Sequence, residues 1–243
     1  TYIWSNTLND WEAGRVLEET WKYFSWGKRK IKERLDPAGA NLVTTWDYYV
    51  YATEPGCGNG GGIGDVRYKE SPDGSWEYYE YNEEGDVVFT ATPVNLSSFV
   101  DKATSLQYDE TVEMLYAETN PVETTIKRTM GVETSREYLT QSVNTDQTVL
   151  TEIVYKAVSP GAAWNDPENL WTQSEYYTYE TPFATRLKRV VKSDGTGSIY
   201  SYVNETNGGV TTTASHGLLN AQQDTIVEGT RTVSTVDVTG ERM

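Results

Sequence analysis

The sequence has almost none of the two side chains that most often carry metal and nucleophilic chemistry. It contains one cysteine, Cys57, and one histidine, His216, in 243 residues. A single cysteine forms no internal disulfide, so the count neither supports nor excludes an oxidising compartment. A zinc site built from several Cys and His ligands is ruled out as well. We interpret His216 as a loop residue before Gly217, and Cys57 as part of a mobile glycine-rich loop.

Long apolar runs are also missing. No stretch is apolar over the length that a membrane-spanning helix needs, so we expect no membrane insertion. The first ten residues, TYIWSNTLND, carry no signal-peptide pattern and begin with Thr1 instead of Met. We therefore expect the chain to be a segment of a longer polypeptide.

Positive charge is scarce. The 20 Lys and Arg residues stand against 36 Asp and Glu, which gives a formal net charge of -16 and a pI near 4.5. Such a chain repels phosphate backbones and anionic lipid surfaces. We therefore expect no nucleic-acid partner, and binding to anionic membranes is disfavoured.

Aromatic residues are abundant instead. The chain has 18 Tyr and 8 Trp, and aromatic residues make up 12% of it. Tyr, Trp, Thr and Val fit the pleated, half-buried surface of a β-sheet. The length suffices for one large β domain or two small ones. The composition predicts an all-β fold with little helix.

The clearest local pattern is RYKESPDGSWEYYEYNEEGDVVFTATP, residues 67–93. Ser71-Pro72-Asp73-Gly74 predicts a turn, because Pro fixes φ, Asp bonds to its own backbone and Gly adopts the left-handed conformation. Asn82-Glu83-Glu84-Gly85 predicts a second turn of this kind. We predict positive φ at both glycines and an antiparallel meander with strands at 65–70, 75–81 and 86–92.

This pattern recurs along the chain. Residues 189–213 repeat it with a Ser193-Asp194-Gly195 turn and a Tyr200-x-Tyr202 strand. One meander cannot bury both of its faces, whereas stacked copies cover one another. More than about two-fifths of the chain should therefore be strand. Partial copies are found at residues 31–56, at residues 126–156 and in the C-terminal EGTRTVSTVDVTGERM.

Longer segments separate the copies. Residues 94–122 hold one of the few helix-compatible runs, and residues 158–182 predict a loop that enters a strand. The glycine-rich run 56–64 predicts a flexible excursion. Residues 10–30 are compatible with a short helix or with two strands joined at Ala13-Gly14, and their aromatic alternation favours the strands. We predict one β-repeat region over residues 1–243, with insertions near 94–122 and 158–182.

The repeated unit resembles the YD repeats of the rearrangement-hotspot (RHS) and teneurin-like proteins. Asn82 stands where the signature Asp is usual, Asp86 follows Gly85 where Arg is common, and Val236 replaces Tyr before Asp237. The resemblance covers about half of the chain, in patches. It is carried by Pro72-Asp73-Gly74, Tyr79-x-Tyr81-Asn82-Glu83-Glu84-Gly85, Tyr200-x-Tyr202 and Asp237-Val238-Thr239-Gly240.

The resemblance implies a fold of stacked antiparallel β-meanders, a spiralling sheet or solenoid. It also implies a structural role at the cell surface or outside the cell, as a building block of a shell, stalk or fibre. In some relatives the shell encloses a toxic C-terminal domain, and this sequence shows no such domain. The expected partners are further repeats of the same polypeptide or neighbouring copies, bound through strand edges.

Candidate chemistry is sparse. GCGNGGGIG lacks the G-K-[ST] of a phosphate loop. The turns NEEGD and NTDQ offer oxygen atoms but match no EF-hand. Acid pairs arise by chance in so acidic a chain, so we expect no catalytic residue, no cofactor-binding residue, no metal ligand and no enzymatic activity. The acids of the clearest repeat are Glu77, Glu80, Glu83, Glu84 and Asp86.

One alternative from another functional class stays open: a carbohydrate-binding module or an acid-pair glycan-active enzyme. The aromatic segments at 21–26, 46–51 and 174–179 would then form an exposed platform for sugar rings. The structural hypothesis places the same side chains in the interior instead. Exposure of these aromatic residues therefore discriminates between the two.

Overall fold

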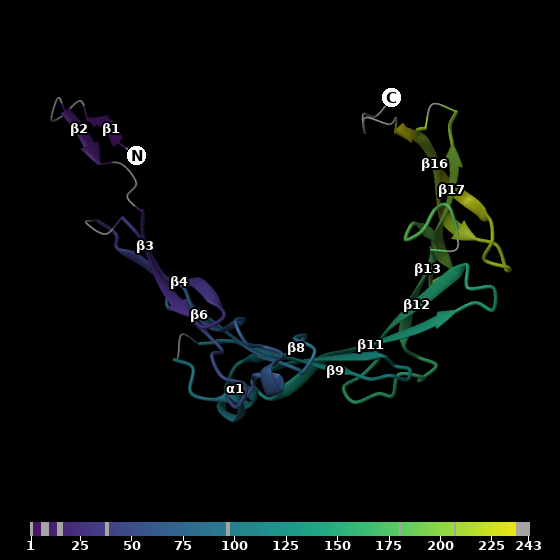
Figure 1. Ribbon diagram of the computed structural model, residues 1–243. Helices are drawn as coiled ribbons and strands as arrows, with labels where there is room; N and C mark the ends of the chain where they lie inside the picture. Colours follow the sequence, from purple (N-terminus) through teal and green to yellow (C-terminus); the bar gives the residue numbers. More distant parts are fainter. Residues whose placement is uncertain are drawn as a thin grey trace. The chain divides into compact units, whose positions relative to one another are not determined.

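A computed structural model describes residues 2–5, 10–13, 17–36, 39–95, 98–179, 181–206 and 208–236. Antiparallel strands dominate this part of the chain, so the predicted all-β class is confirmed (Figure 1). Its helical elements are α1, Lys102–Tyr108, and one 3-10 turn, η1, Gly58–Gly60. No helix in these ranges is long and apolar enough to span a membrane.

Two strands, β1 (Tyr2–Ser5) and β2 (Asp10–Ala13), form a two-stranded sheet of their own. The other strands hydrogen-bond in chain order from β3 to β17, and the pairs with a described register are antiparallel. Their bounds are β3 Leu17–Phe24, β4 Gly27–Leu35, β5 Leu42–Tyr48, β6 Val66–Glu70, β7 Trp76–Tyr81, β8 Val87–Thr92, β9 Glu110–Tyr116, β10 Glu123–Thr129, β11 Val132–Val143, β12 Val149–Lys156, β13 Leu170–Tyr177, β14 Leu187–Lys192, β15 Thr196–Asn204, β16 Val210–Leu219 and β17 Ile226–Val236.

The chain divides into two compact units. The first unit is Thr1–Met114 with Ile126–Thr134, and the second unit is Leu115–Thr125 with Ser135–Met243. Strands β9, β10 and β11 contribute residues to both. Each unit is described by itself.

The predicted meander is confirmed in the first unit. Strands β6, β7 and β8 lie within one residue of the predicted bounds. The φ angles of Gly74 and Gly85 are 81° and 89°, as their turns require. Asp73 Oδ1 accepts hydrogen bonds from the Ser75 amide at 3.0 Å and the Ser75 hydroxyl at 2.6 Å, which fixes the first turn.

The core of the first unit lies on one face of this meander. Trp76, Tyr78, Phe89 and Ala91 are buried there, because alternate residues of a strand share a face. Residues of the 94–122 insertion cover this face: Phe99 and Leu106 pack against the cluster, and α1 lies against β8 (Figure 1). Asp101 begins α1 by accepting the Thr104 amide at 2.7 Å.

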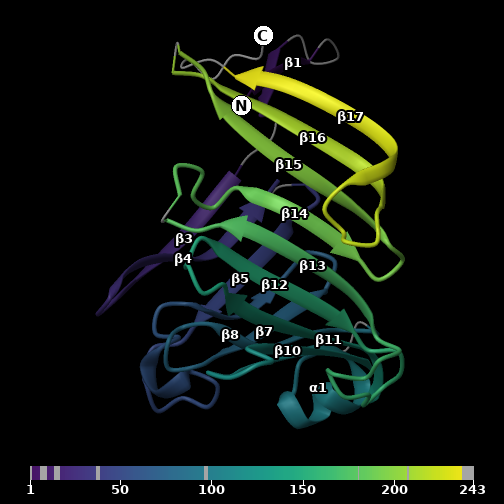
Figure 2. The ribbon, with the colours of Figure 1, turned by 90° about the vertical axis from the view of Figure 1, so that its right-hand side faces the viewer.

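The second unit repeats the meander with β14, β15 and β16, which lie side by side in Figure 2. Asp194 Oδ1 accepts the Thr196 amide at 2.9 Å and the Thr196 hydroxyl at 2.7 Å, the same contacts that Asp73 makes. The predicted turn at 144–147 is also present, with the Asn144 side chain accepting the Thr148 amide at 2.8 Å. A turn at 220–223, which the sequence analysis missed, uses Asn220 in the same way.

Other expectations about strands and loops have mixed outcomes. Residues 158–169 form a loop that enters β13, as predicted. Residues 10–30 contribute to three strands, β2, β3 and β4, so strand structure is confirmed there but the predicted number of two strands is wrong. One repeat region over residues 1–243 stays a prediction. Gly14, Pro37, Ala38 and residues 237–243 lie outside the described residues, and with them the predicted link at Ala13-Gly14 and the end of the C-terminal copy.

One contact recurs in at least three places among the described residues and is called here the tyrosine–bulge contact. In β4, β6 and β14, one extra residue interrupts the register with the preceding strand; these bulge residues are Ile31, Arg67 and Lys188. A tyrosine hydroxyl of the following strand donates to the carbonyl oxygen just before each bulge. The pairs are Tyr48 to Lys30 at 2.7 Å, Tyr81 to Val66 at 3.0 Å and Tyr202 to Leu187 at 2.7 Å.

The register around these contacts is the same each time. The residue after the bulge faces a residue three positions before the tyrosine, in the pairs Lys32–Thr45, Tyr68–Tyr78 and Arg189–Ile199. A second ring lies near the tyrosine ring in both units: Tyr49 is 5.9 Å from Tyr81, and Tyr177 is 6.3 Å from Tyr202, in edge-on geometry. The repeat seen in the sequence is therefore a repeat of side-chain contacts.

Candidate functional site

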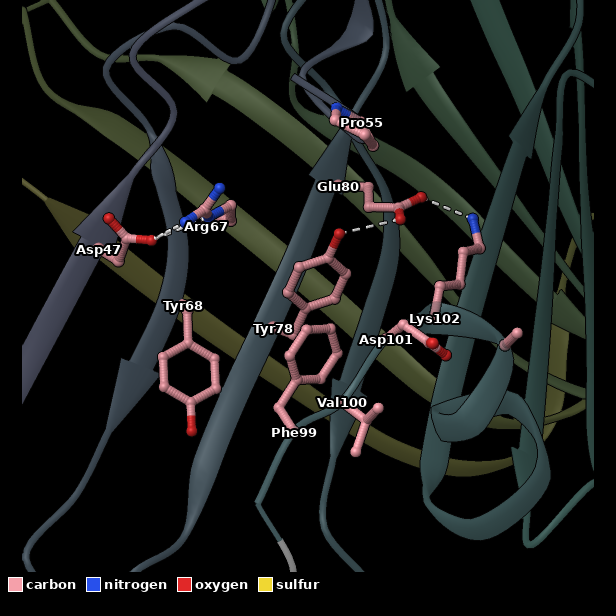
Figure 3. Close-up of a pocket in the computed structure, with 11 residues that line it drawn as sticks. Asp47, Pro55, Arg67, Tyr68, Tyr78, Glu80, Phe99, Val100, Asp101 and Lys102 are labelled. Carbon is pink, nitrogen blue, oxygen red and sulfur yellow. Dashed lines mark hydrogen bonds and ion pairs between the residues drawn. The ribbon is translucent and has the colours of Figure 1, made fainter.

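The first unit contains a pocket of about 630 Å³, here called the first-unit pocket (Figure 3). This volume falls within the range of small-ligand sites. The lining residues come from β5, β6 and β7, from the excursion between β5 and β6, and from the insertion after β8. They are Asp47, Pro55, Arg67, Tyr68, Tyr78, Glu80, Phe99, Val100, Asp101, Lys102 and Ala103.

Aromatic rings form one wall of this pocket. Tyr78 and Phe99 stack with centroids 4.2 Å apart, and the Tyr68 ring lies 5.9 Å from Phe99. Trp76 supports both Tyr68 and Phe99 from the buried side, at 6.2 Å and 5.3 Å. The wall is thus held in place by the core of the unit.

Arg67 reaches the pocket because it is a bulge residue. The register shift in β6 leaves Arg67 without a partner in β5, and a bulge redirects the side chain it carries. The guanidinium binds the Asp47 carboxylate and donates to Glu54 at 2.9 Å. Two acids therefore compensate this positive charge.

Glu80, Lys102 and Tyr78 form the second polar group of the pocket (Figure 3). Lys102 donates to Glu80 at 2.6 Å, and the Tyr78 hydroxyl donates to the same carboxylate at 3.1 Å. The Lys102 ammonium also lies 4.4 Å from the centre of the Phe89 ring. Burial raises the pKa of Tyr78 to about 12, so its hydroxyl keeps its proton and remains a donor.

The acids singled out in the sequence are not brought together as a pair. Strand alternation places Glu77 and Glu80 on opposite faces of β7. Glu77 accepts the Tyr79 hydroxyl at 2.6 Å and pairs with Lys69 at 3.1 Å, and the hydrogen bond from Tyr79 lowers the pKa of Glu77. Glu83 accepts from Asn59 in the turn after β7. Glu84 and Asp86 are exposed in the same turn.

The prediction of a flexible glycine-rich excursion is wrong. Cys57 is fully buried, and burial raises the pKa of its thiol, so a reactive thiolate is disfavoured. The run is packed against the end of β7: a Cβ on Gly61 would lie 2.1 Å from the Asn82 carbonyl oxygen, and one on Gly62 would lie 2.8 Å from the Tyr81 ring. The glycines are therefore needed for close approach.

His216 is not a loop residue, which corrects the sequence interpretation. It lies within β16 opposite Ser198 of β15, and its Nδ1 is 2.7 Å from the Ser198 hydroxyl oxygen. The Tyr200 ring lies 5.9 Å away, edge-on. No carboxylate of the described residues is hydrogen-bonded to His216, so the third member of a catalytic triad is not shown.

The three aromatic segments are split between interior and surface. Tyr48 and Tyr49 are buried, whereas Trp21 and Tyr23 are exposed, Tyr23 by 78%. Lys28 lies over both exposed rings, at 5.0 Å and 5.5 Å. Neither the interior hypothesis nor the platform hypothesis therefore holds for all three segments. In 174–179, Tyr176 and Tyr177 are half-buried and Tyr179 is exposed.

Within the described ranges, no group of three or more His, Cys, Asp and Glu side chains is arranged to hold a metal ion. The sequence matches no protein-family model, and a search of curated proteins finds no match.

The residues that the sequence analysis missed are Arg67, Phe99 and Lys102. The only signal for Phe99 and Lys102 was the helix-compatible character of their insertion, and no local signal marked Arg67 as a bulge residue.

Proposed function

We propose that this chain is a structural β-repeat segment of an extracellular or cell-surface protein, a building block of a shell, stalk or fibre. The tyrosine–bulge contact carries the proposal. It occurs with one register in both units, at Tyr48, Tyr81 and Tyr202. A contact that repeats from strand to strand gives each copy the same neighbour contacts, as a repeat protein requires. The resemblance to RHS and teneurin-like repeats supports the location.

The strand edges support the proposed partners, which are further repeats or neighbouring copies. Strands β3 and β17 end the strand order, and every residue of β3 before Phe24 is exposed. In β17, Val227 and Val233 are exposed by 60% and 56%. Exposed edges of this length favour pairing with another strand.

The experiment is assembly by the purified chain. We expect analytical ultracentrifugation to show concentration-dependent association that the double variant Val227→Lys/Val233→Lys suppresses, because charge on an edge opposes pairing. Val132→Lys is the matched control, since Val132 is exposed by 66% within the interior strand β11. A monomeric chain would contradict the proposal if the native polypeptide carrying these residues also had a mass of only 27 kDa.

The first-unit pocket favours a second candidate function, binding of a neutral saccharide. Its ring wall suits the apolar face of a sugar. Both of its cations are already paired, Arg67 with Asp47 and Lys102 with Glu80, and its remaining carboxylate, Asp101, accepts the Thr104 amide, so a neutral ligand with many hydroxyl groups satisfies the remaining donors and acceptors without displacing an ion pair.

Calorimetric titration with neutral hexasaccharides of glucose, xylose, mannose and N-acetylglucosamine tests this candidate. Lys102→Met removes the ammonium but keeps an apolar chain over Phe89, and should weaken binding at least about fivefold, as loss of a charged hydrogen bond does. Lys127→Met is the control, because Lys127 is exposed outside the pocket. Absence of binding at 10 mM, or equal binding by both variants, would exclude the candidate.

A further inference from the structure

The last described strand of the second unit contains the first half of a further tyrosine–bulge contact. In β17, Val227 is an extra residue relative to β16, because Leu218 pairs with Glu228 and Leu219 pairs with Ile226. The register shift is the one found at Ile31, Arg67 and Lys188. The carbonyl just before the bulge is that of Ile226.

In the copies at Tyr48, Tyr81 and Tyr202, the strand on the other side of the bulge supplies the tyrosine. That strand places a residue opposite the position after the bulge and the tyrosine three residues further on. For β17, no described strand follows, since β17 ends the strand order. Residues 227–233 of β17 are exposed and present a strand edge to solvent.

We infer that the outer edge of β17 binds an antiparallel strand that carries a tyrosine three residues beyond the residue opposite Glu228. The hydroxyl of this tyrosine donates to the Ile226 carbonyl oxygen. The partner is a strand of the same repeat type, and main-chain hydrogen bonds supply the rest of the contact. The inference rests on the proposed structural function and adds the register and the side chain that the partner must have.

A peptide with the sequence of residues 195–204, GTGSIYSYVN, is the probe. In the inferred register, its Ile199 faces Glu228 and its Tyr202 reaches Ile226. The same two residues of β15 face Arg189 and reach the Leu187 carbonyl oxygen in the folded chain. We expect fluorescence anisotropy to show saturable binding to the whole chain. Deuterium exchange should show new protection in β17 and none in β3.

Two peptide variants distinguish the contact from general strand pairing. The Tyr202→Phe peptide should bind about fivefold more weakly, because it lacks the donor of one hydrogen bond. The Tyr200→Phe peptide should bind like the parent, since Tyr200 has no such role in the register. Neither change touches the folded chain, so loss of folding cannot explain a difference.

The outcomes separate this inference from the proposed function. Equal affinity of all three peptides, protection in β3, or no binding at 5 mM would overturn the inference. If the chain still associates through β17 in the ultracentrifuge, the proposed function stands and only the tyrosine register fails. If it neither associates nor binds peptide, both fail.

Discussion

Residues 66–81 of the first unit and 187–202 of the second form the same two strands in the same register, yet they bury different side chains. On one face, both carry the bonded tyrosine, Tyr81 or Tyr202. On the other face, Trp76 and Tyr78 of the first unit correspond to Gly197 and Ile199 of the second. The face with the bonded tyrosine therefore has the same contacts in both units, while the residues on the other face differ between the units.

The cover differs between the units. In the first unit, Phe99 and Leu106 of the insertion pack over Trp76 and Tyr78. In the second unit, a Cβ on Gly197 would lie 2.2 Å from the Val190 carbonyl oxygen of the neighbouring strand β14 and 2.6 Å from the Leu219 side chain of β16. The first unit therefore buries large rings at these positions, whereas the second packs its strands too closely at Gly197 to admit a side chain.

The largest expected effect on stability comes from truncating Trp76, whose ring has no counterpart at Gly197 in the second unit. Trp76→Ala should lower the free energy of unfolding by about 3–5 kcal/mol, because Trp76 is 2% exposed and supports the aromatic wall. Urea unfolding followed by circular dichroism measures it. Tyr23→Ala, at a ring exposed by 78%, is the control. A loss below about 1 kcal/mol would show that the insertion does not cover the face tightly.

The corresponding position in the second unit should respond to added volume. Gly197→Ala should cost about 2 kcal/mol, since the new methyl group meets backbone that cannot move far. Ser201→Ala, at an exposed position of the same strand, should change stability by less than about 0.5 kcal/mol. Equal stability of the two variants in urea would contradict close packing at Gly197.

The turns could be predicted from the sequence, whereas the bulges and the pocket could not. Asp73-Gly74 and Asp194-Gly195 mark turns through contacts within a few residues, so they act before any strand pairs. A bulge such as Arg67 depends on the register between strands separated by a long excursion. His216 lies in a strand because its neighbours pair on both sides, a contact that its local sequence does not encode.

The pocket and the core could not be predicted, because they depend on packing between segments that lie far apart in the sequence. Tyr79 and Tyr81 are half-buried, whereas Tyr78 on the opposite face of the same strand is buried. In a strand with rings on both faces, sequence alternation does not tell which face is covered. Phe99 stacks on Tyr78 and so covers that face of the strand, although it lies 21 residues further along the chain.

The tyrosine hydroxyls should have equal effects in both units. Tyr81→Phe and Tyr202→Phe should each lower stability by about 1 kcal/mol, the net value of one hydrogen bond. Tyr23→Phe is the matched control, because the Tyr23 ring is exposed whereas the rings of Tyr81 and Tyr202 are half-buried. If only one of the two variants differed from the parent in urea, the contact would not be a common element of the repeat.

The smallest expected effect concerns the two Asp-Gly turns, which should titrate alike. Hydrogen bonds from the Ser75 hydroxyl and amide lower the pKa of Asp73, and those from Thr196 lower the pKa of Asp194. Each carboxyl therefore contributes stability above its unfolded pKa, near 3.9, and this contribution is lost as pH falls through the lower folded value. Carboxyl carbon shifts in NMR titrations measure both groups.

Two hydroxyl deletions serve as each other's controls. Ser75→Ala should raise the pKa of Asp73 and leave that of Asp194 unchanged, and Thr196→Val should do the reverse, because each removes the largest cause of one shift. The two increases should be similar, since the oxygen–oxygen distances are 2.6 Å and 2.7 Å. A clear inequality would mean that the turns differ between the units in spite of their common geometry, and the equivalence of the two meanders would then be limited to their tyrosine faces.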